Sequence, residues 1–207
     1  ENEQARARAA LAPLYARFAG MDEKQLAADT QAMGIGERLY LNNCAACHGS
    51  DARGSKGFPN LADRDWLWGG SFDDIQKTIA EGRNGVMPPM ADAVGGGEHV
   101  RNVAHYVLSL SNSPHDSVAA QLGRSRFANC AACHGADGKG NPALGAPNLA
   151  DKVWLYGGSL ATVMESISKG RDNRMPAFGP LIGEGKAQLL AAYVWSLSNN
   201  AAPAKIG

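Results

Sequence analysis

The sequence has no excess of charge of either sign, no long hydrophobic run and only four cysteines in 207 residues. Twenty basic residues balance twenty acidic ones, so the basic surface that marks nucleic-acid binders is missing. Because no apolar run approaches the roughly 20 residues that span a bilayer, we expect no transmembrane helix in this sequence. The hydrophobic fraction of 44% is that of a folded, globular protein.

The four cysteines all fall in two copies of one heptapeptide, Asn-Cys-Ala-Ala-Cys-His-Gly, at 43–49 and 129–135. Other segments recur in the same order in both halves, namely Pro-Asn-Leu-Ala-Asp, Trp-Leu-x-Gly-Gly-Ser, Gly-Arg, Met-Pro and Tyr-Val-x-Ser-Leu-Ser. A repeat of this kind indicates duplication of one structural unit. We therefore predict a helical lead-in at 1–33 and two domains at 34–113 and 114–207. The boundary falls near Pro114, which discourages a continuous helix.

Each repeat is expected to be helical, with long loops rich in glycine and proline. Ser71 and Ser159 are typical helix N-caps, and Gly82 and Gly170 typical helix ends. Strand signals are nearly absent, so the expected fold class is all-α. The predicted helices are 36–43, 72–81 and 98–110 in the first repeat, and 117–129, 160–169 and 186–197 in the second.

The spacing Cys-x-x-Cys-His is typical of covalent haem c attachment. Two cysteines one helical turn apart can both reach the porphyrin, and the following histidine can ligate the iron. We thus predict two haems c, one on each of two tandem class I-like cytochrome c domains. Zinc binding and dithiol chemistry are the alternatives for such cysteine pairs. The predicted attachment residues are Cys44, Cys47, Cys130 and Cys133, and the predicted proximal ligands are His48 and His134.

A methionine thioether is the usual sixth ligand of a cytochrome c haem. Met87 and Met175 occupy equivalent Met-Pro loops, so we assign Met87 to the first iron and Met175 to the second. Met90 competes with Met87, but its counterpart in the second repeat is Phe178.

Three further pairs of residues are candidates for the haem surroundings. Pro59 and Pro147 follow the two histidines and either accept a hydrogen bond from them or form a simple turn. Two recurring tryptophans and two recurring arginines either contact haem propionates or, in the case of the tryptophans, pack against the porphyrin. These residues are Trp66, Trp154, Arg83 and Arg171. His99, His105 and His115 lack counterparts, and we expect them at the surface or in loops.

The segments 60–70 and 148–158, together with the lead-in Pro13-Leu14-Tyr15-Ala16, resemble the diheme subunit III of bacterial cbb3-type cytochrome c oxidases. The resemblance covers nearly the whole chain. It implies an electron relay without a catalytic site of its own, on the periplasmic side of the inner membrane. It also implies that electrons arrive from a donor cytochrome c or quinol-oxidising complex. They would leave to the monohaem cytochrome c subunit and then to the catalytic subunit, which reduces oxygen.

This family has an N-terminal membrane anchor, which the sequence lacks; we expect that an anchor or signal peptide preceded Glu1. Two other functions remain open. A soluble diheme carrier similar to the cytochromes c4 would have this length, and a diheme peroxidase would need one iron with an open position. The matching Met-Pro loops favour an electron carrier over a peroxidase.

Overall fold

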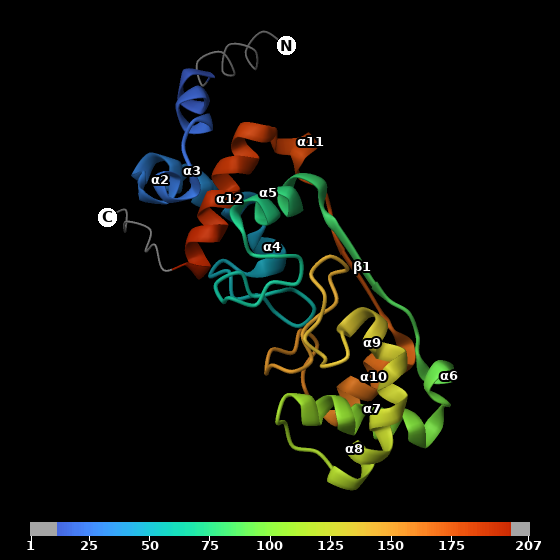
Figure 1. Ribbon diagram of the computed structural model, residues 1–207. Coiled ribbons are helices and arrows are strands. Elements are labelled where there is room, and N and C mark those ends of the chain that lie inside the picture. The colour runs from blue at the N-terminus through green and yellow to red at the C-terminus, as the bar shows by residue number, and fades with distance from the viewer. Residues whose placement is uncertain (1–11, 200–207) are drawn as a thin grey trace. The chain divides into compact units, whose positions relative to one another are not determined.

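The computed structural model describes residues 12–199, and these residues are mostly helical with one small sheet (Figure 1). A first helix covers residues 12–19. The elements of the first repeat and its lead-in are α2 (Glu23–Ala28), α3 (Thr30–Asn43), α4 (Ala45–His48), α5 (Phe72–Glu81), β1 (Arg83–Met87), α6 (Ala91–Val94) and α7 (Gly97–Leu110). Those of the second are α8 (Ser117–Arg124), η1 (Ser125–Phe127), α9 (Ala128–His134), α10 (Leu160–Lys169), β2 (Arg171–Met175), α11 (Gly179–Ile182) and α12 (Glu184–Ser198).

The chain forms two compact units that cut across the two repeats. Unit 1 contains the described residues up to Arg64, then Gly70–Gly82, then those from Pro176 onward. Unit 2 contains Asp65–Gly69 and Arg83–Met175. Each unit therefore combines the cysteine motif of one repeat with the closing helix of the other. The structure thus groups the residues differently from the sequence ranges 34–113 and 114–207.

Unit 1 is built on the crossing of α3 with α12, which lie side by side in Figure 1. Gly36 makes the crossing possible, because a Cβ there would lie 2.6 Å from the Cβ of Tyr193 and 2.7 Å from the carbonyl oxygen of Leu189. The Tyr40 and Tyr193 rings meet four residues further along, with centroids 5.6 Å apart. Helix α12 thus covers the helix that leads into the first cysteine motif.

Unit 2 repeats this arrangement with α7 of the first repeat against α8 of the second. A Cβ on Gly123 would overlap the backbone of Asn102, and the ring of Phe127 lies 5.1 Å from that of Tyr106. The second repeat is one residue shorter between this crossing and its first cysteine. The 3-10 helix η1, a tighter helix than the α-helix, occupies the shortened stretch and breaks the helix predicted at 117–129.

Local signals predicted the two short helices of the repeats correctly. In α5 the Ser71 hydroxyl accepts a hydrogen bond from the backbone of Asp74, and in α10 the Ser159 hydroxyl accepts one from Thr162. The helices end at Gly82 and Gly170, as expected. Helix α2 begins with a capping box, in which the side chains of Asp22 and Gln25 each accept a hydrogen bond from the other's backbone N–H. In α8 the N-cap is Asp116, whose side chain accepts the N–H groups of Val118 and Ala119.

The antiparallel pair β1–β2 in unit 2 was not predicted from the sequence. Its register sets Arg83 opposite Met175 and Met87 opposite Arg171. The strand sequences Arg-Asn-Gly-Val-Met and Arg-Asp-Asn-Arg-Met contain only one β-branched residue, so their strand propensity is low. One face of the ribbon is nevertheless half-buried at alternate positions in both strands, which holds it in an extended form.

Candidate haem-attachment sites

Each cysteine motif lies on a short helical turn that ends at its histidine. His48 is the last residue of α4, and His134 is the last residue of α9. The first cysteine of each motif is buried and the second is exposed, and all four thiols are free. The side chains of both histidines are buried. The two motifs therefore present the same three groups in the same order and in the same exposure.

Both histidines bond to a proline carbonyl through the same ring nitrogen. Nδ1 of His48 lies 2.9 Å from the Pro59 oxygen, and Nδ1 of His134 lies 3.0 Å from the Pro147 oxygen. A carbonyl oxygen only accepts hydrogen bonds, so each Nδ1 must carry the proton. In the neutral ring Nε2 is then the unprotonated nitrogen and can ligate a metal. The contact favours the acceptor interpretation of the two prolines over a simple turn.

The loops that bring these prolines back to the histidines depend on one glycine each. Gly54 and Gly140 donate their N–H groups to the carbonyls of His48 and His134, each over 2.8 Å. Both have positive φ angles, 70° and 81°. A Cβ on Gly140 would lie 2.5 Å from the Ala146 oxygen, so a larger residue would push the loop away from the histidine. The second loop keeps this closure although it is two residues longer.

The environment of the buried cysteines argues against dithiol chemistry. Burial, together with the neighbouring Cys47, raises the pKa of the Cys44 thiol to about 11. Burial beside Cys133 also raises the pKa of Cys130. Thiol–disulfide exchange uses a thiolate, and reactive cysteines have a lowered pKa. Zinc gains no support either, because residues 12–199 contain no group of three His, Cys, Asp or Glu side chains placed to hold a metal.

The predicted methionine ligands lie at opposite ends of the β1–β2 ribbon. Both side chains are half-buried. Met87, the last residue of β1, belongs to the unit that holds His134 and not to the unit of His48. Met175 is the last residue of unit 2, and the chain passes to unit 1 at the next residue. The pairing of Met87 with His48, expected from their order in the sequence, therefore joins residues of different units.

Met90 and Phe178 occupy equivalent places, as the repeat alignment indicated. The N–H of Met90 donates to the carbonyl of Ile167 in unit 2, and the N–H of Phe178 donates to that of Ile79 in unit 1. The Met90 side chain packs against the hydrophobic core that includes Cys130 and Phe127. Met90 is thus placed as a packing residue at the point where phenylalanine serves in the other unit.

The recurring arginines stack on aromatic rings that sequence reasoning did not single out. The Arg83 guanidinium lies 5.2 Å from the ring of Trp68, and that of Arg171 lies 4.1 Å from the ring of Tyr156. Arg171 also donates to the Ser166 hydroxyl over 2.8 Å. The recurrence of an aromatic residue two positions after each predicted tryptophan was the signal available for these stacks. Both arginines lie on the first residue of a strand, on the half-buried face.

The two predicted tryptophans are half-buried. Trp154 packs against the hydrophobic core of unit 2, which contains Cys130. Trp66 belongs to the short segment Asp65–Gly69, which is also part of unit 2.

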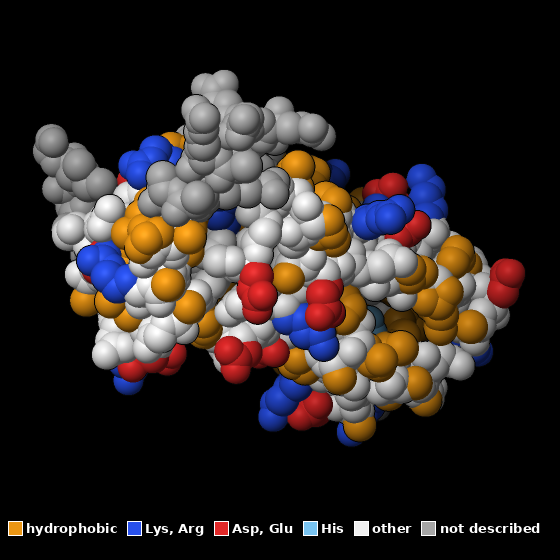
Figure 2. Space-filling model, turned by 90° about the horizontal axis from the view of Figure 1, so that it is seen from above, with side chains coloured by type: hydrophobic (Ala, Val, Ile, Leu, Met, Phe, Trp, Pro, Cys, Tyr) orange, Lys and Arg blue, Asp and Glu red, His pale blue; other side chains and the backbone are white. Residues whose placement is uncertain are grey.

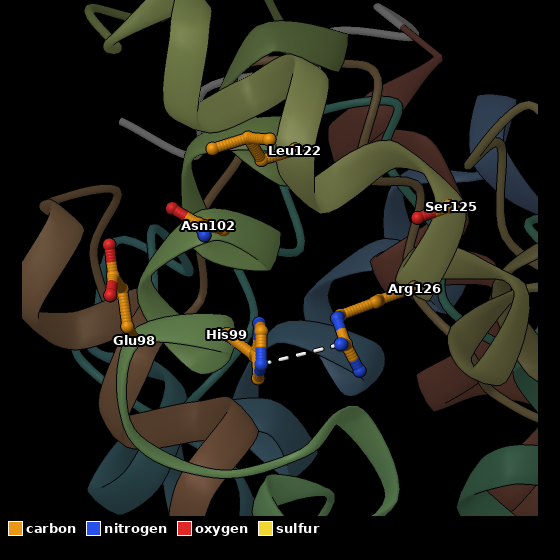
Figure 3. Close-up of a pocket in the computed structure, with 6 residues that line it drawn as sticks. All are labelled: Glu98, His99, Asn102, Leu122, Ser125 and Arg126. Carbon is orange, nitrogen blue, oxygen red and sulfur yellow. Dashed lines mark hydrogen bonds between the residues drawn. The ribbon is translucent and has the colours of Figure 1, made fainter.

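A pocket of about 360 Å³ lies in unit 2, and its lining includes no residue of either cysteine motif (Figure 3). Arg126 donates to the Val94 carbonyl over 2.8 Å and lies 3.3 Å from Nε2 of His99. The expectation that His105 would be a surface or loop residue is wrong, because it is buried on α7. Its Nδ1 accepts the N–H of Asp116. These histidines pack or bond within the α7–α8 region.

The surface agrees with the even charge balance of the sequence. Acidic and basic side chains are interspersed on the face shown in Figure 2. Among residues 12–199, no helix has the length and hydrophobicity needed to cross a membrane.

Comparison with known proteins identifies the family of this chain. The family described as cytochrome c oxidase, cbb3-type, subunit III matches residues 31–107 and 119–194. The chain is 58% identical, over 95% of its length, to the cbb3-type cytochrome c oxidase subunit CcoP of Rubrivivax gelatinosus. It is 45% identical, over 78% of its length, to the subunit FixP of Azorhizobium caulinodans. It spans 64% and 58% of the lengths of these two relatives.

Both matched ranges contain one Cys-x-x-Cys-His motif and the histidine–proline contact that orients it. The duplicated motif, the two equivalent sites and the similarity over most of the sequence agree with one another. The chain belongs to the subunit III family of cbb3-type cytochrome c oxidases.

Proposed function

We propose that this chain carries two covalent haems c and relays single electrons from a donor cytochrome c, or a quinol-oxidising complex, toward the other subunits of a cbb3-type oxidase. The observation that carries the proposal is the pair of equivalent histidine–proline bonds beside the two cysteine motifs. The relatives are named as subunits of that oxidase, and these names indicate the assembly in which this chain would work. The relay would work on the periplasmic side of the inner membrane, next to the monohaem and catalytic subunits.

The residues present fit a haem c at each motif. Cys44 and Cys47, and likewise Cys130 and Cys133, are free thiols one helical turn apart, as two thioether bonds require. The proline carbonyl holds the Nδ1 proton and fixes the ring, which leaves Nε2 of His48 or His134 for the iron. The side-chain sulfurs of Met87 and Met175 would be the second protein ligands of the two irons. When bound, each haem iron changes between the ferric and ferrous states and so carries one electron.

The chain's own residues would tune and protect these groups. Trp154 packs against the core beside Cys130 and would exclude water from the porphyrin face. Trp66 would exclude water in the same way from the haem that lies next to the segment Asp65–Gly69. Arg83 and Arg171 have aromatic partners for their guanidinium faces and can direct N–H groups to propionates. In this proposal the repeats 34–113 and 114–207 each attach one haem, and residues 1–33 form the lead-in.

The test is an optical redox titration of the purified holoprotein, with carbon monoxide added to the reduced form. A relay predicts two covalently bound, six-coordinate, low-spin haems that do not bind carbon monoxide. It also predicts rapid reduction of both haems by a reduced donor cytochrome c in a stopped-flow mixing experiment. A high-spin fraction that binds carbon monoxide would contradict the relay and favour peroxidase-type chemistry, because such chemistry needs an open position on one iron.

A further inference from the structure

We propose that Trp68, a residue of the first repeat, is a positioning residue for His134 of the second repeat. Its indole ring supports the loop 141–146, and this loop sets the place of the Pro147 carbonyl, which accepts the Nδ1 proton of His134. The proposal rests on the proposed function, because there the role of His134 is to ligate a haem iron.

The first argument is the contact between Trp68 and the loop. A Cβ on Gly145 would lie 2.7 Å from Cη2 of the Trp68 indole, and closer still to two neighbouring ring carbons. Gly145 also has a positive φ angle of 63°. Trp68 and the loop 141–146 both belong to unit 2. The six-membered ring of the indole thus lies directly against the loop backbone, in space that only a glycine leaves open.

The second argument is that the first strand of the ribbon holds the indole ring in place. The Arg83 guanidinium lies 5.2 Å from the centroid of the Trp68 ring. A Cβ on Gly85 would lie 3.5 Å from Cζ2 of the same ring, an ordinary packing distance. Arg83 and Gly85 both lie on the half-buried face of β1. The indole therefore contacts both the ribbon and Gly145, and it ties the loop to the ribbon.

The third argument follows the chain from the loop to His134. Two backbone hydrogen bonds between Asn141 and Ala146, of 2.9 and 3.1 Å, close the loop. The next residue is Pro147, whose carbonyl oxygen lies 3.0 Å from Nδ1 of His134. A shift of the loop backbone at Gly145 would therefore move this acceptor. Such an acceptor fixes the ring of a ligating histidine and raises its basicity.

The fourth argument is the difference in length between the two equivalent loops. In the first repeat, Ser55 and Phe58 form the same pair of backbone hydrogen bonds, and only residues 56–57 lie between them. In the second repeat the pair encloses residues 142–145. A longer loop loses more conformational entropy when it closes. We therefore expect the second loop to depend on a contact from outside its own repeat, and Trp68 provides one.

The main experiment compares the wild-type holoprotein with the variant Trp68→Ala. Proton NMR of the reduced protein follows the exchange with solvent of the Nδ1 protons of His48 and His134, and a redox titration gives the haem potentials. The His134 proton should exchange several-fold faster in the variant, because its acceptor is no longer held. The potential of the haem that His134 ligates should rise, because a less basic ligand stabilises ferric iron less. The His48 proton should not change.

Val100→Ala is the matched control for this comparison. It removes buried apolar volume from unit 2, on α7, and should leave the His134 proton and the haem potential at their wild-type values. An unchanged His134 proton in Trp68→Ala, an equal change at His48, or an equal change in Val100→Ala would each overturn the proposal.

A double-mutant cycle separates the direct contact from a general loss of packing. Gly145→Ala alone should also speed the exchange of the His134 proton, since the new methyl group meets the indole ring. In the Trp68→Ala background the ring is gone, so the same substitution should have a smaller effect. Equal effects of Gly145→Ala in the two backgrounds would show that Trp68 does not act through the loop.

Trp68→Phe covers the case in which Trp68→Ala does not fold. Phenylalanine keeps an aromatic ring but lacks the far edge of the indole that meets Gly145, so we expect a smaller change in the same direction. Wild-type exchange at His134 in this variant would contradict the proposal. A wild-type protein without a haem on Cys130 and Cys133 would instead contradict the proposed function. The His134 proton of the haem-free chain would then carry the same comparison.

Discussion

The two units orient their histidines in the same way but anchor the surrounding backbone differently. In unit 1 the buried Tyr40 hydroxyl donates to the carbonyl of Gly49, the residue after His48, over 2.6 Å. The edge of Phe58 also meets the His48 ring, with centroids 6.3 Å apart. In unit 2 the corresponding positions are Phe127, which has no hydroxyl, and Ala146. Duplication has thus kept the histidine–proline geometry and changed its support. If each motif carries a haem, as proposed, we expect the two haems to have unequal potentials.

The strongest way to break the comparison is to remove one attachment site at a time. Replacing Cys44 and Cys47 with alanine should lower the covalent haem content from two to one, because no thioether can form in unit 1. Replacing Cys130 and Cys133 should do the same for unit 2. Mass spectrometry of the intact chain gives the count. Each variant should keep the optical spectrum of the remaining haem, and a chain that lost both haems after one double substitution would show that the sites are not independent.

The helix crossings offer a second comparison. A Cβ at Gly123 would overlap the Asn102 carbonyl, whereas one at Gly36 would meet Tyr193 and Leu189 at 2.6 and 2.7 Å. Overpacking costs about 1–3 kcal/mol, and alanine regains about 1 kcal/mol of helix propensity. We expect Gly123→Ala to lower the free energy of unfolding of unit 2 by about 2 kcal/mol, and Gly36→Ala to lower that of unit 1 by less.

Hydrogen exchange can assign each loss to one unit, since amides of α7 and α8 report on unit 2 and amides of α3 and α12 on unit 1. Gly20→Ala is the control, because a Cβ there meets nothing within 4 Å. Equal loss of protection in both units from either substitution would show that they unfold together.

A substitution with a smaller expected effect removes the difference between Tyr40 of unit 1 and its counterpart Phe127 of unit 2. Tyr40→Phe removes the buried hydrogen bond to Gly49 and gives unit 1 the residue type of unit 2. The expected loss is about 1 kcal/mol, confined to unit 1. Chemical denaturation followed at each haem's absorption would measure it. If the two haem potentials also converge in a redox titration, the Tyr40 anchor is one cause of their difference.

The smallest expected effect is a loss of folding stability that appears only in alkaline solution. Burial, with contributions from Cys44, Tyr193 and Asp51, raises the pKa of Tyr40 from 10.0 to about 12. The neutral phenol is therefore favoured in the folded state, and its contribution is complete below pH 10 and lost as the pH rises toward 12. Unfolding experiments across this range should show a steeper loss of stability for the wild type than for Tyr40→Phe. Parallel curves would mean that the pKa of Tyr40 is the same in the folded and the unfolded chain, which would contradict the raised value.

Local signals in the sequence predicted the parts of the fold that depend on neighbouring residues. The caps Ser71 and Ser159 and the end residues Gly82 and Gly170 act within one helical turn, so α5 and α10 followed from them. The histidine–proline contacts were one of the two interpretations that the recurring prolines allowed, and the structure favours that one over a simple turn. These features recur in both repeats because each is complete within a short segment.

Features that depend on distant residues could not be predicted in this way. The β1–β2 ribbon pairs two segments of weak strand propensity, and only their pairing gives them extended structure. The exchange of closing helices leaves no local trace, because both repeats close with the same Tyr-Val-x-Ser-Leu-Ser segment, which does not distinguish one repeat from the other. The burial of His105 follows from the same exchange, since its ring nitrogen accepts the N–H of Asp116 at the start of α8.

The crossing of α3 with α12 also has a consequence for synthesis. Unit 1 contains the first cysteine motif, but α12, which packs on the helix leading into that motif, is synthesised after every residue of unit 2. Contacts between residues far apart in the sequence form slowly, because a long loop must first close. Unit 2 is uninterrupted from Arg83 to Met175 and can fold while the chain is still growing. The second cysteine motif in the sequence would then be the first to be enclosed by its unit, and the synthesis of α12 would set the time at which the first motif is enclosed.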